Sequence, residues 1–164
     1  MLKIVKFGSP VLRKKCRQVR EITPEIRDLI QEMLKTLRVA QGVGLAAPQV
    51  SRDLRIIVVD IDQNPISLVN PEILKKSREL VAGEEGCLSL PGLILKIKRP
   101  RWAVVEGCRP SDGQKIKIKA EGLLARVLQH EIEHLDGILI LDRISFWQRW
   151  QAIKKLKRAL KRQQ

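Results

Sequence analysis

The residues best suited to chemistry are His130 and His134, the only two histidines in the 164-residue chain. Their i and i+4 spacing places both imidazoles on one face of an α-helix, where they can bind a single metal ion. Glu131 is offset by about a third of a turn, so its carboxylate can reach a water on that ion without becoming a ligand. The alternative is a pair of surface histidines on a charged helix.

A catalytic metal site needs a third protein ligand and an open fourth position. After His134 the only acids are Asp136 and Asp142, which are too close in sequence to follow a metalloprotease pattern. Another such pattern requires a third histidine where this chain has Ile140. The third ligand is therefore expected upstream.

Cys87 is the best upstream candidate, because Gly86, Pro91 and Gly92 around it allow a close backbone approach. Its alternative is a buried structural cysteine. Cys16, expected on a short surface helix, and Cys108, at the end of an expected strand, are interpreted as packed or peripheral residues. An odd number of cysteines does not indicate a disulfide framework.

Three segments, in this order, closely resemble the signature motifs of the peptide deformylases: GVGLAAPQ at 42–49, EGCLS at 85–89 and QHEIEH at 129–134. The opening segment 7–13, FGSPVLR, is also similar to that family. The resemblance covers nearly the whole chain, with Ser51 as a local departure where a glycine is common. It implies a metal-dependent hydrolase that removes the N-formyl group from the N-terminal formylmethionine of newly synthesised proteins.

The resemblance implies that Cys87, His130 and His134 hold a divalent metal with a water in the fourth position. A cation lowers the pKa of such a water and so supplies a hydroxide for attack on the formyl carbon, which releases formate. Fe²⁺ is the physiological ion that the resemblance implies, while a Cys/His/His set also accepts Zn²⁺, Ni²⁺ and Co²⁺.

Three further residues receive roles by similarity to the family. The Gln49 side-chain amide and the Leu88 backbone N–H would donate hydrogen bonds to the formyl oxygen. Glu131 would accept the proton of the water and pass it to the leaving amine. Without the resemblance, Gln49 would be interpreted as an ordinary loop glutamine.

Substrate binding is also inferred from the resemblance. The peptide would add as a strand beside Val43 and Gly44 and beside the segment that ends at Gly86, a form of β-augmentation that tolerates many sequences. Leu123 and Val127, shortly before the histidines, are placed to form an apolar pocket for the methionine side chain. Their alternative is a plain role in the core.

The expected fold class is α+β: a single compact domain over residues 1–164, with mixed or antiparallel β-sheets around a central helix that carries the histidines. Thr23 and Pro24 begin a helix that ends near Gln41-Gly42. The central helix is expected over about 123–136, with one stripe facing the core and another containing the histidines. Residues 1–6 alternate as in a strand, and further strands are expected at 55–60, 66–69, 93–98, 102–106 and 115–119.

The net charge is +14, from 32 Lys and Arg against 18 Asp and Glu. Residues 143–164 contain eight basic residues and no acid, and their spacing predicts a basic amphipathic helix. We expect its aromatic side, with Phe146, Trp147 and Trp150, to pack on the domain. Together with the resemblance, the charge favours ribosomal RNA as a partner, and a solvated helix face is the alternative.

Two other classes of function stay open at this point. A nucleic-acid-binding module with a structural zinc site would need Cys16 or Cys108 as a fourth ligand. A metalloprotease is disfavoured by the missing downstream ligand. Unpaired cysteines and the lack of an export signal predict a cytoplasmic protein, and no apolar run is long enough to span a membrane. A monomer is the default expectation.

Overall fold

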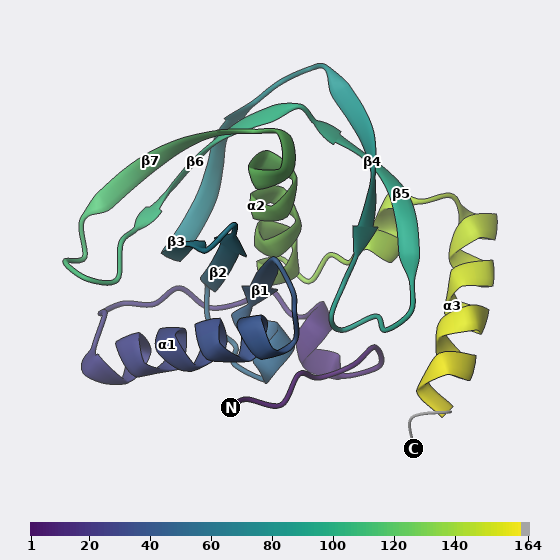
Figure 1. Ribbon diagram of the computed structural model, residues 1–164, viewed down its shortest axis with the longest axis horizontal. Helices are drawn as coiled ribbons and strands as arrows, with labels where there is room; N and C mark the ends of the chain where they lie inside the picture. Colours follow the sequence, from purple (N-terminus) through teal and green to yellow (C-terminus); the bar gives the residue numbers. More distant parts are fainter. Residues whose placement is uncertain (162–164) are drawn as a thin grey trace.

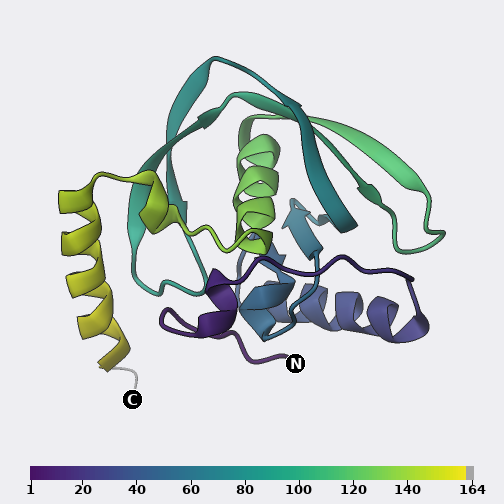
Figure 2. The same cartoon turned by 180° about the vertical axis from the view of Figure 1, so that it is seen from behind.

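The computed structural model describes residues 1–161 and has helix α2 (Gly122–Leu135) near its middle, with strands around it (Figure 1). Seen from behind, α2 again lies between the β-strands and the N-terminal part of the chain (Figure 2). The strands form two antiparallel sheets, one of five strands in the order β1-β2-β3-β6-β7 and one of two strands, β4-β5. The predicted α+β class is confirmed.

The elements have the following bounds. The five-stranded sheet contains β1 (Gly44–Ala46), β2 (Ile56–Ile61), β3 (Asn64–Lys76), β6 (Trp102–Cys108) and β7 (Lys115–Glu121). The smaller sheet pairs β4 (Leu80–Gly86) with β5 (Ile94–Pro100). The other α-helices are α1 (Pro24–Val39) and α3 (Phe146–Lys161), and short 3-10 helices cover Pro10–Arg13, Ala47–Val50 and Ile140–Arg143.

Three hydrophobic clusters hold these elements around α2. One lies between α1 and strands β1 and β2, and includes Met33 and Leu37. A second joins α2, through Leu128 and Leu135, to the inner face of the large sheet. The third lies where β5, the last 3-10 helix and α3 meet. Because α2 is packed on its core stripe, its histidines are fixed relative to both sheets.

The helices begin and end close to the predicted positions. Pro24 is at the first turn of α1, where its missing N–H leaves no intrahelical hydrogen bond unmade. Helix α2 ends before Gly137, whose φ of +72° suits a residue without a Cβ. No helix within residues 1–161 is both long enough and apolar enough to cross a membrane.

Two predictions for the N-terminal region are wrong. Residues 1–6 form no strand; instead, the N–H groups of Val5 and Phe7 donate to the carbonyls of Gln49 and Ser89. Cys16 lies beyond the short 3-10 helix and is buried, with its N–H donating to the Leu135 carbonyl at 2.7 Å. In both segments, hydrogen bonds to distant backbone groups determine the conformation, and the local sequence pattern does not.

The orientation predicted for the C-terminal helix is also wrong. Helix α3 is present, but Phe146, Trp147 and Trp150 are 75%, 72% and 54% exposed, while Ala152 and Leu156 are buried. Small and aliphatic side chains fill the contact with the third cluster, and the bulkier rings lie on the other side. Residues 162–164 of the predicted helix lie outside the described residues.

Substitution of Gly137 tests the close contact at the end of α2. A Cβ at Gly137 would lie 2.6 Å from the Arg13 carbonyl oxygen, whereas one at Gly113, which has φ +71°, would meet nothing within 4 Å. We predict that Gly113→Ala costs about 1–2 kcal/mol of unfolding free energy from the positive φ alone. Gly137→Ala should cost clearly more, because backbone must also move. Chemical denaturation measures both, and equal losses would contradict the prediction.

Candidate metal and active site

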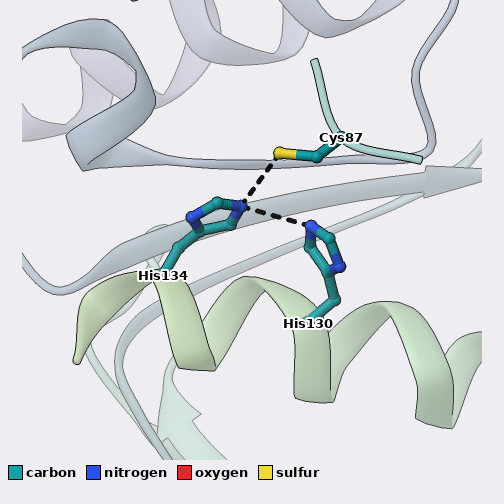
Figure 3. Close-up of side chains that lie close together, drawn as sticks. All are labelled: Cys87, His130 and His134. Atoms are coloured by element: carbon teal, nitrogen blue, oxygen red, sulfur yellow. Dashed lines mark hydrogen bonds between the residues drawn. The ribbon is translucent and has the colours of Figure 1, made fainter. Parts of the chain in front are cut away.

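Three potential metal ligands converge beside α2. His130 and His134 lie one turn apart on the helix, and Cys87 approaches them from the loop after β4 (Figure 3). The two Nε2 atoms are 3.2 Å apart, and the Cys87 Sγ lies 3.3 Å from the His134 Nε2. All three donor atoms lie within 4.8 Å of one another. The structure thus brings together the three residues predicted as ligands.

The surrounding groups fit a divalent metal at this point. The His130 Nδ1 is 2.9 Å from the Glu85 Oε2, so its proton belongs on Nδ1 and the lone pair of Nε2 faces Cys87 and His134. The Glu131 Oε2 is a buried oxygen without a hydrogen-bond partner among residues 1–161. A soft thiolate, two imidazoles and a carboxylate free to bind water form a donor set that suits a catalytic metal.

Glu131 is enclosed by the backbone of β1. A Cβ at Gly44 would collide with its Oε1 and would come within 2.8 Å of the Val127 Cγ1, so only glycine permits this approach. Burial raises the pKa of Glu131 to about 7, although the positive charge of Arg99 opposes the shift. A carboxyl group with a pKa near neutrality suits both taking and giving a proton.

Glu85 connects the metal ligands to the small sheet. Its carboxylate accepts two hydrogen bonds from Arg99, at 2.5 and 2.9 Å, and one from Arg126 at 2.7 Å, in addition to the bond from His130. Burial alone would raise the pKa of Glu85, but hydrogen bonds from His130 and Arg99, with the Arg99 charge, lower it to about 2. Glu85 therefore stays ionised and holds the His130 ring in place.

The side chain of Gln49 is oriented by its neighbours. It is buried, and its Oε1 accepts a hydrogen bond from the Ala46 N–H at 2.8 Å. Its Nε2 consequently faces the site, 3.3 Å from the Ser89 Oγ and 3.5 Å from the Cys87 Sγ. The Gln49 side chain is thus beside the metal ligands, with its N–H groups directed at Cys87 and Ser89.

Residues 5 and 6 form hydrogen bonds to the two loops that carry Gln49 and Leu88, the predicted donors to the formyl oxygen. The Lys6 Nζ donates to the Leu88 carbonyl at 2.9 Å, while Val5 bonds to the backbone of Gln49. Leu88 directly follows Cys87, so its peptide lies at the edge of the site. Sequence reasoning missed Lys6, because a lysine near the start of a basic chain carries no signal of its own.

A cleft of about 460 Å³ opens beside these groups. All five predicted substrate-binding residues line it: Val43, Gly44, Gly86, Leu123 and Val127. Val43, Leu123 and Ile94 are apolar yet 45%, 53% and 60% exposed. Apolar side chains left open beside a polar, buried centre are typical of a binding site for a small ligand or peptide.

The family model for polypeptide deformylases matches residues 1–150. The chain belongs to the polypeptide deformylase family. Among curated deformylases, it is 48% identical over 143 residues to the peptide deformylase of Dictyoglomus turgidum, covering 87% of this chain and 92% of the relative. It is 46% identical over 162 residues to that of Thermodesulfovibrio yellowstonii, covering 96% and 97%.

Solved deformylase structures share the fold over almost the whole chain. The crystal structure of the peptide deformylase from Ehrlichia chaffeensis aligns with a TM-score of 0.94 at 35% identity, covering 99% of this chain and 98% of the other. That from Synechococcus elongatus, in complex with actinonin, aligns with a TM-score of 0.89 at 38% identity, covering 94% and 86%. The α+β arrangement around α2 is therefore that of the deformylases.

The other two cysteines lie elsewhere in this deformylase fold. Cys16 belongs to the core cluster beneath α2, and Cys108 packs against the cluster of α1. The group of potential ligands found within residues 1–161 contains neither of them. A closed zinc site that recruits Cys16 or Cys108 as a fourth ligand is not supported.

Removing the charge of Glu85 tests whether its hydrogen bond to the His130 Nδ1 supports metal binding. We predict that Glu85→Gln lowers metal affinity about 10- to 100-fold, because the amide can no longer fix the Nδ1–H tautomer as the carboxylate does. Glu79→Gln, whose side chain lies just before β4 and is 63% exposed, should leave the affinity unchanged. Competition with a chelator measures both, and equal affinity in the two variants would refute the role of Glu85.

Proposed function

We propose that this chain removes the N-formyl group from the N-terminal formylmethionine of newly synthesised proteins and releases formate. The observation that carries the proposal is that Cys87, His130 and His134 come together at a cleft that Glu131 also lines, and within residues 1–161 the Glu131 Oε2 has no hydrogen-bond partner. Membership of the deformylase family supports the same activity. Fe²⁺ is the proposed ion, and Zn²⁺, Ni²⁺ or Co²⁺ could replace it in this donor set.

The residues divide the chemistry among them. When bound, a divalent metal acts as a Lewis acid and lowers the pKa of water at the site. Glu131 takes the proton of the attacking water and delivers it to the nitrogen of the leaving amine. The Gln49 Nε2 and the Leu88 N–H donate hydrogen bonds to the formyl oxygen as negative charge develops on it, and one such donor is typically worth about 3 kcal/mol.

The substrate backbone would lie between two strand edges. Within the described residues, β1 pairs only with β2 and β4 pairs only with β5, so each has an edge without a partner strand. Val43 and Gly44 lie at the start of β1, and Gly86 is the last residue of β4. An extended peptide could bond to both, while Leu123 and Val127 receive its methionine side chain.

The role of Glu131 is tested by Glu131→Gln. We expect formate release from a formylmethionyl tripeptide to fall by about 100-fold or more, since proton transfer is lost, while the bound metal is retained. In the parent, kcat/KM should rise with pH as Glu131 deprotonates, with a midpoint at or below 7 because a nearby cation favours the carboxylate.

Glu121→Gln, at the exposed start of α2, serves as the control and should keep full activity. Mass analysis of the product distinguishes deformylation from proteolysis, because only a protease shortens the peptide. Undiminished formate release by Glu131→Gln would contradict the mechanism, and a shortened peptide would contradict the function.

We also propose that α3 binds ribosomal RNA. The exposed face of α3 carries Phe146, Trp147 and Trp150 together with lysines, and the Lys154 Nζ lies 5.1 Å from the centre of the Trp150 ring. Exposed aromatic rings can stack on unpaired bases, and lysines neutralise phosphates. The observed outward orientation suits RNA better than the predicted inward one.

Charge removal on α3 tests this partner. We expect ribosome binding by the parent to weaken steeply between about 50 and 200 mM salt, because counterions are released on binding. A triple substitution to Gln at Lys154, Lys157 and Lys161 should abolish the binding in co-sedimentation. The matched control is the same change at three exposed lysines of β7, Lys115, Lys117 and Lys119. Equal losses in both variants would indicate non-specific charge attraction.

The remaining assignments are a cytoplasmic location, a monomeric state and one deformylase-like domain over residues 1–164. Unpaired cysteines within residues 1–161 support a reducing compartment.

A further inference from the structure

The ammonium group of Lys6 lies in the wall of the cleft that contains the metal ligands. Its Nζ donates to the Leu88 carbonyl at 2.9 Å and is partly buried. The backbone on both sides of Lys6 is also fixed, because the N–H groups of its two neighbours donate to the carbonyls of Gln49 and Ser89. The ammonium is therefore held beside the cleft by the loops that carry the predicted donors to the formyl oxygen.

Within the described residues, Lys6 is the one charged side chain of the cleft that has no opposite charge beside it. Of its three N–H donors, the Leu88 carbonyl uses one, and a neutral carbonyl does not balance the charge. The other charged residues of the cleft bond to each other, belong to the metal site or lie opposite a lysine of β5: Glu85 with Arg126, His130 with Glu131, and Glu84 across from Lys96.

The cleft has two walls that differ in chemistry. One is formed by apolar side chains of α2, and the other contains Lys6, Leu88 and Gly42. A Cβ at Gly42 would lie 2.9 Å from the Leu88 Cδ1, whereas a Cβ at Gly44 would lie 2.8 Å from the Val127 Cγ1 of α2. The backbone that joins these two glycines therefore runs between the wall of α2 and the wall that holds Lys6.

We infer that Lys6 makes this cleft prefer an acidic side chain at the second residue of the formylated peptide. The inference rests on the proposed deformylase function, in which an extended peptide lies along the start of β1 and points its first side chain towards α2. Successive side chains of an extended chain point to opposite faces, so the second one points to the wall that contains Lys6. A carboxylate there pairs with the free ammonium donors, and a cationic side chain is repelled.

The test compares kcat/KM for formate release from two amidated peptides, formyl-Met-Glu-Ala and formyl-Met-Gln-Ala, which differ in charge but hardly in shape. The parent should favour the glutamate peptide about two- to fivefold at low salt, as for one partly exposed charge pair. This ratio should fall steadily as salt is raised towards about 1 M, because such pairs are screened. Lys6→Gln can still donate to the Leu88 carbonyl but has no charge, so the preference should disappear, whereas Lys6→Arg should retain it.

Lys3→Gln is the matched control, because Lys3 is exposed, does not line the cleft and changes the net charge equally. It should keep the ratio of the parent. A parent without the preference, a ratio that is insensitive to salt, a preference that survives in Lys6→Gln or an equal loss in Lys3→Gln would each overturn the role of Lys6. Formate release from both peptides would still support the proposed function in those cases. A parent that releases no formate from either peptide would overturn the proposed function and this inference together.

Discussion

The carboxylate of Glu85 joins the parts of the molecule from which the site is made. It lies on β4, while its donors come from β5 through Arg99 and from α2 through Arg126 and His130. A buried charge is tolerated only when it is well paired, and removal of one partner leaves a costly unpaired group. This requirement fixes the small sheet relative to α2. Because Cys87 follows two residues after Glu85, it also fixes the thiol relative to both imidazoles.

The loops that carry Gln49 and Leu88 are held mainly by hydrogen bonds to residues 5–7. Residues 5–7 connect the loop of Gln49 to the loop of Leu88 and Ser89 through two backbone hydrogen bonds and the Lys6 ammonium. Gln49 in turn is oriented by Ala46 and Ser89. Ion pairs to Glu85 thus fix the metal ligands, whereas hydrogen bonds that mostly involve the main chain fix the loops of Gln49 and Leu88.

The helices and the chemistry-bearing motifs could be predicted from the sequence, because their signals are local. Helix α1 follows from a proline start and apolar spacing, and α2 from two stripes that end at Gly137. The alternation of Lys and Ile likewise indicates β7, whose lysines protect an exposed edge. Motif order placed Cys87 with the histidines, although 47 and 43 residues separate them in the chain.

The features that were missed, strand β4 and the orientations of α3 and Arg126, depend on distant partners. Strand β4 lacks an apolar alternation, since Gly83 makes room for Arg126 and Glu85 bonds to Arg126 and His130. Helix α3 has two apolar faces, and only the shape of the third core cluster decides which one is buried. An arginine on an amphipathic helix looks the same in sequence whether it faces water or a buried carboxylate, so the position of Arg126 could not be inferred.

Several contacts in and around the site join parts of the chain that are far apart in sequence, and this affects how the protein folds. Lys6 and Leu88 are 82 residues apart, and the ion pair between Arg13 and Asp142 closes a separation of 129. Long loops must close before such contacts contribute any stability, and this slows folding. Since α2 lies in the middle of the core yet comes late in synthesis, a ribosome-bound chain shorter than about 135 residues lacks its central packing partner. The core cluster that contains α2, and the metal site that α2 carries, can therefore be completed only after that point in synthesis.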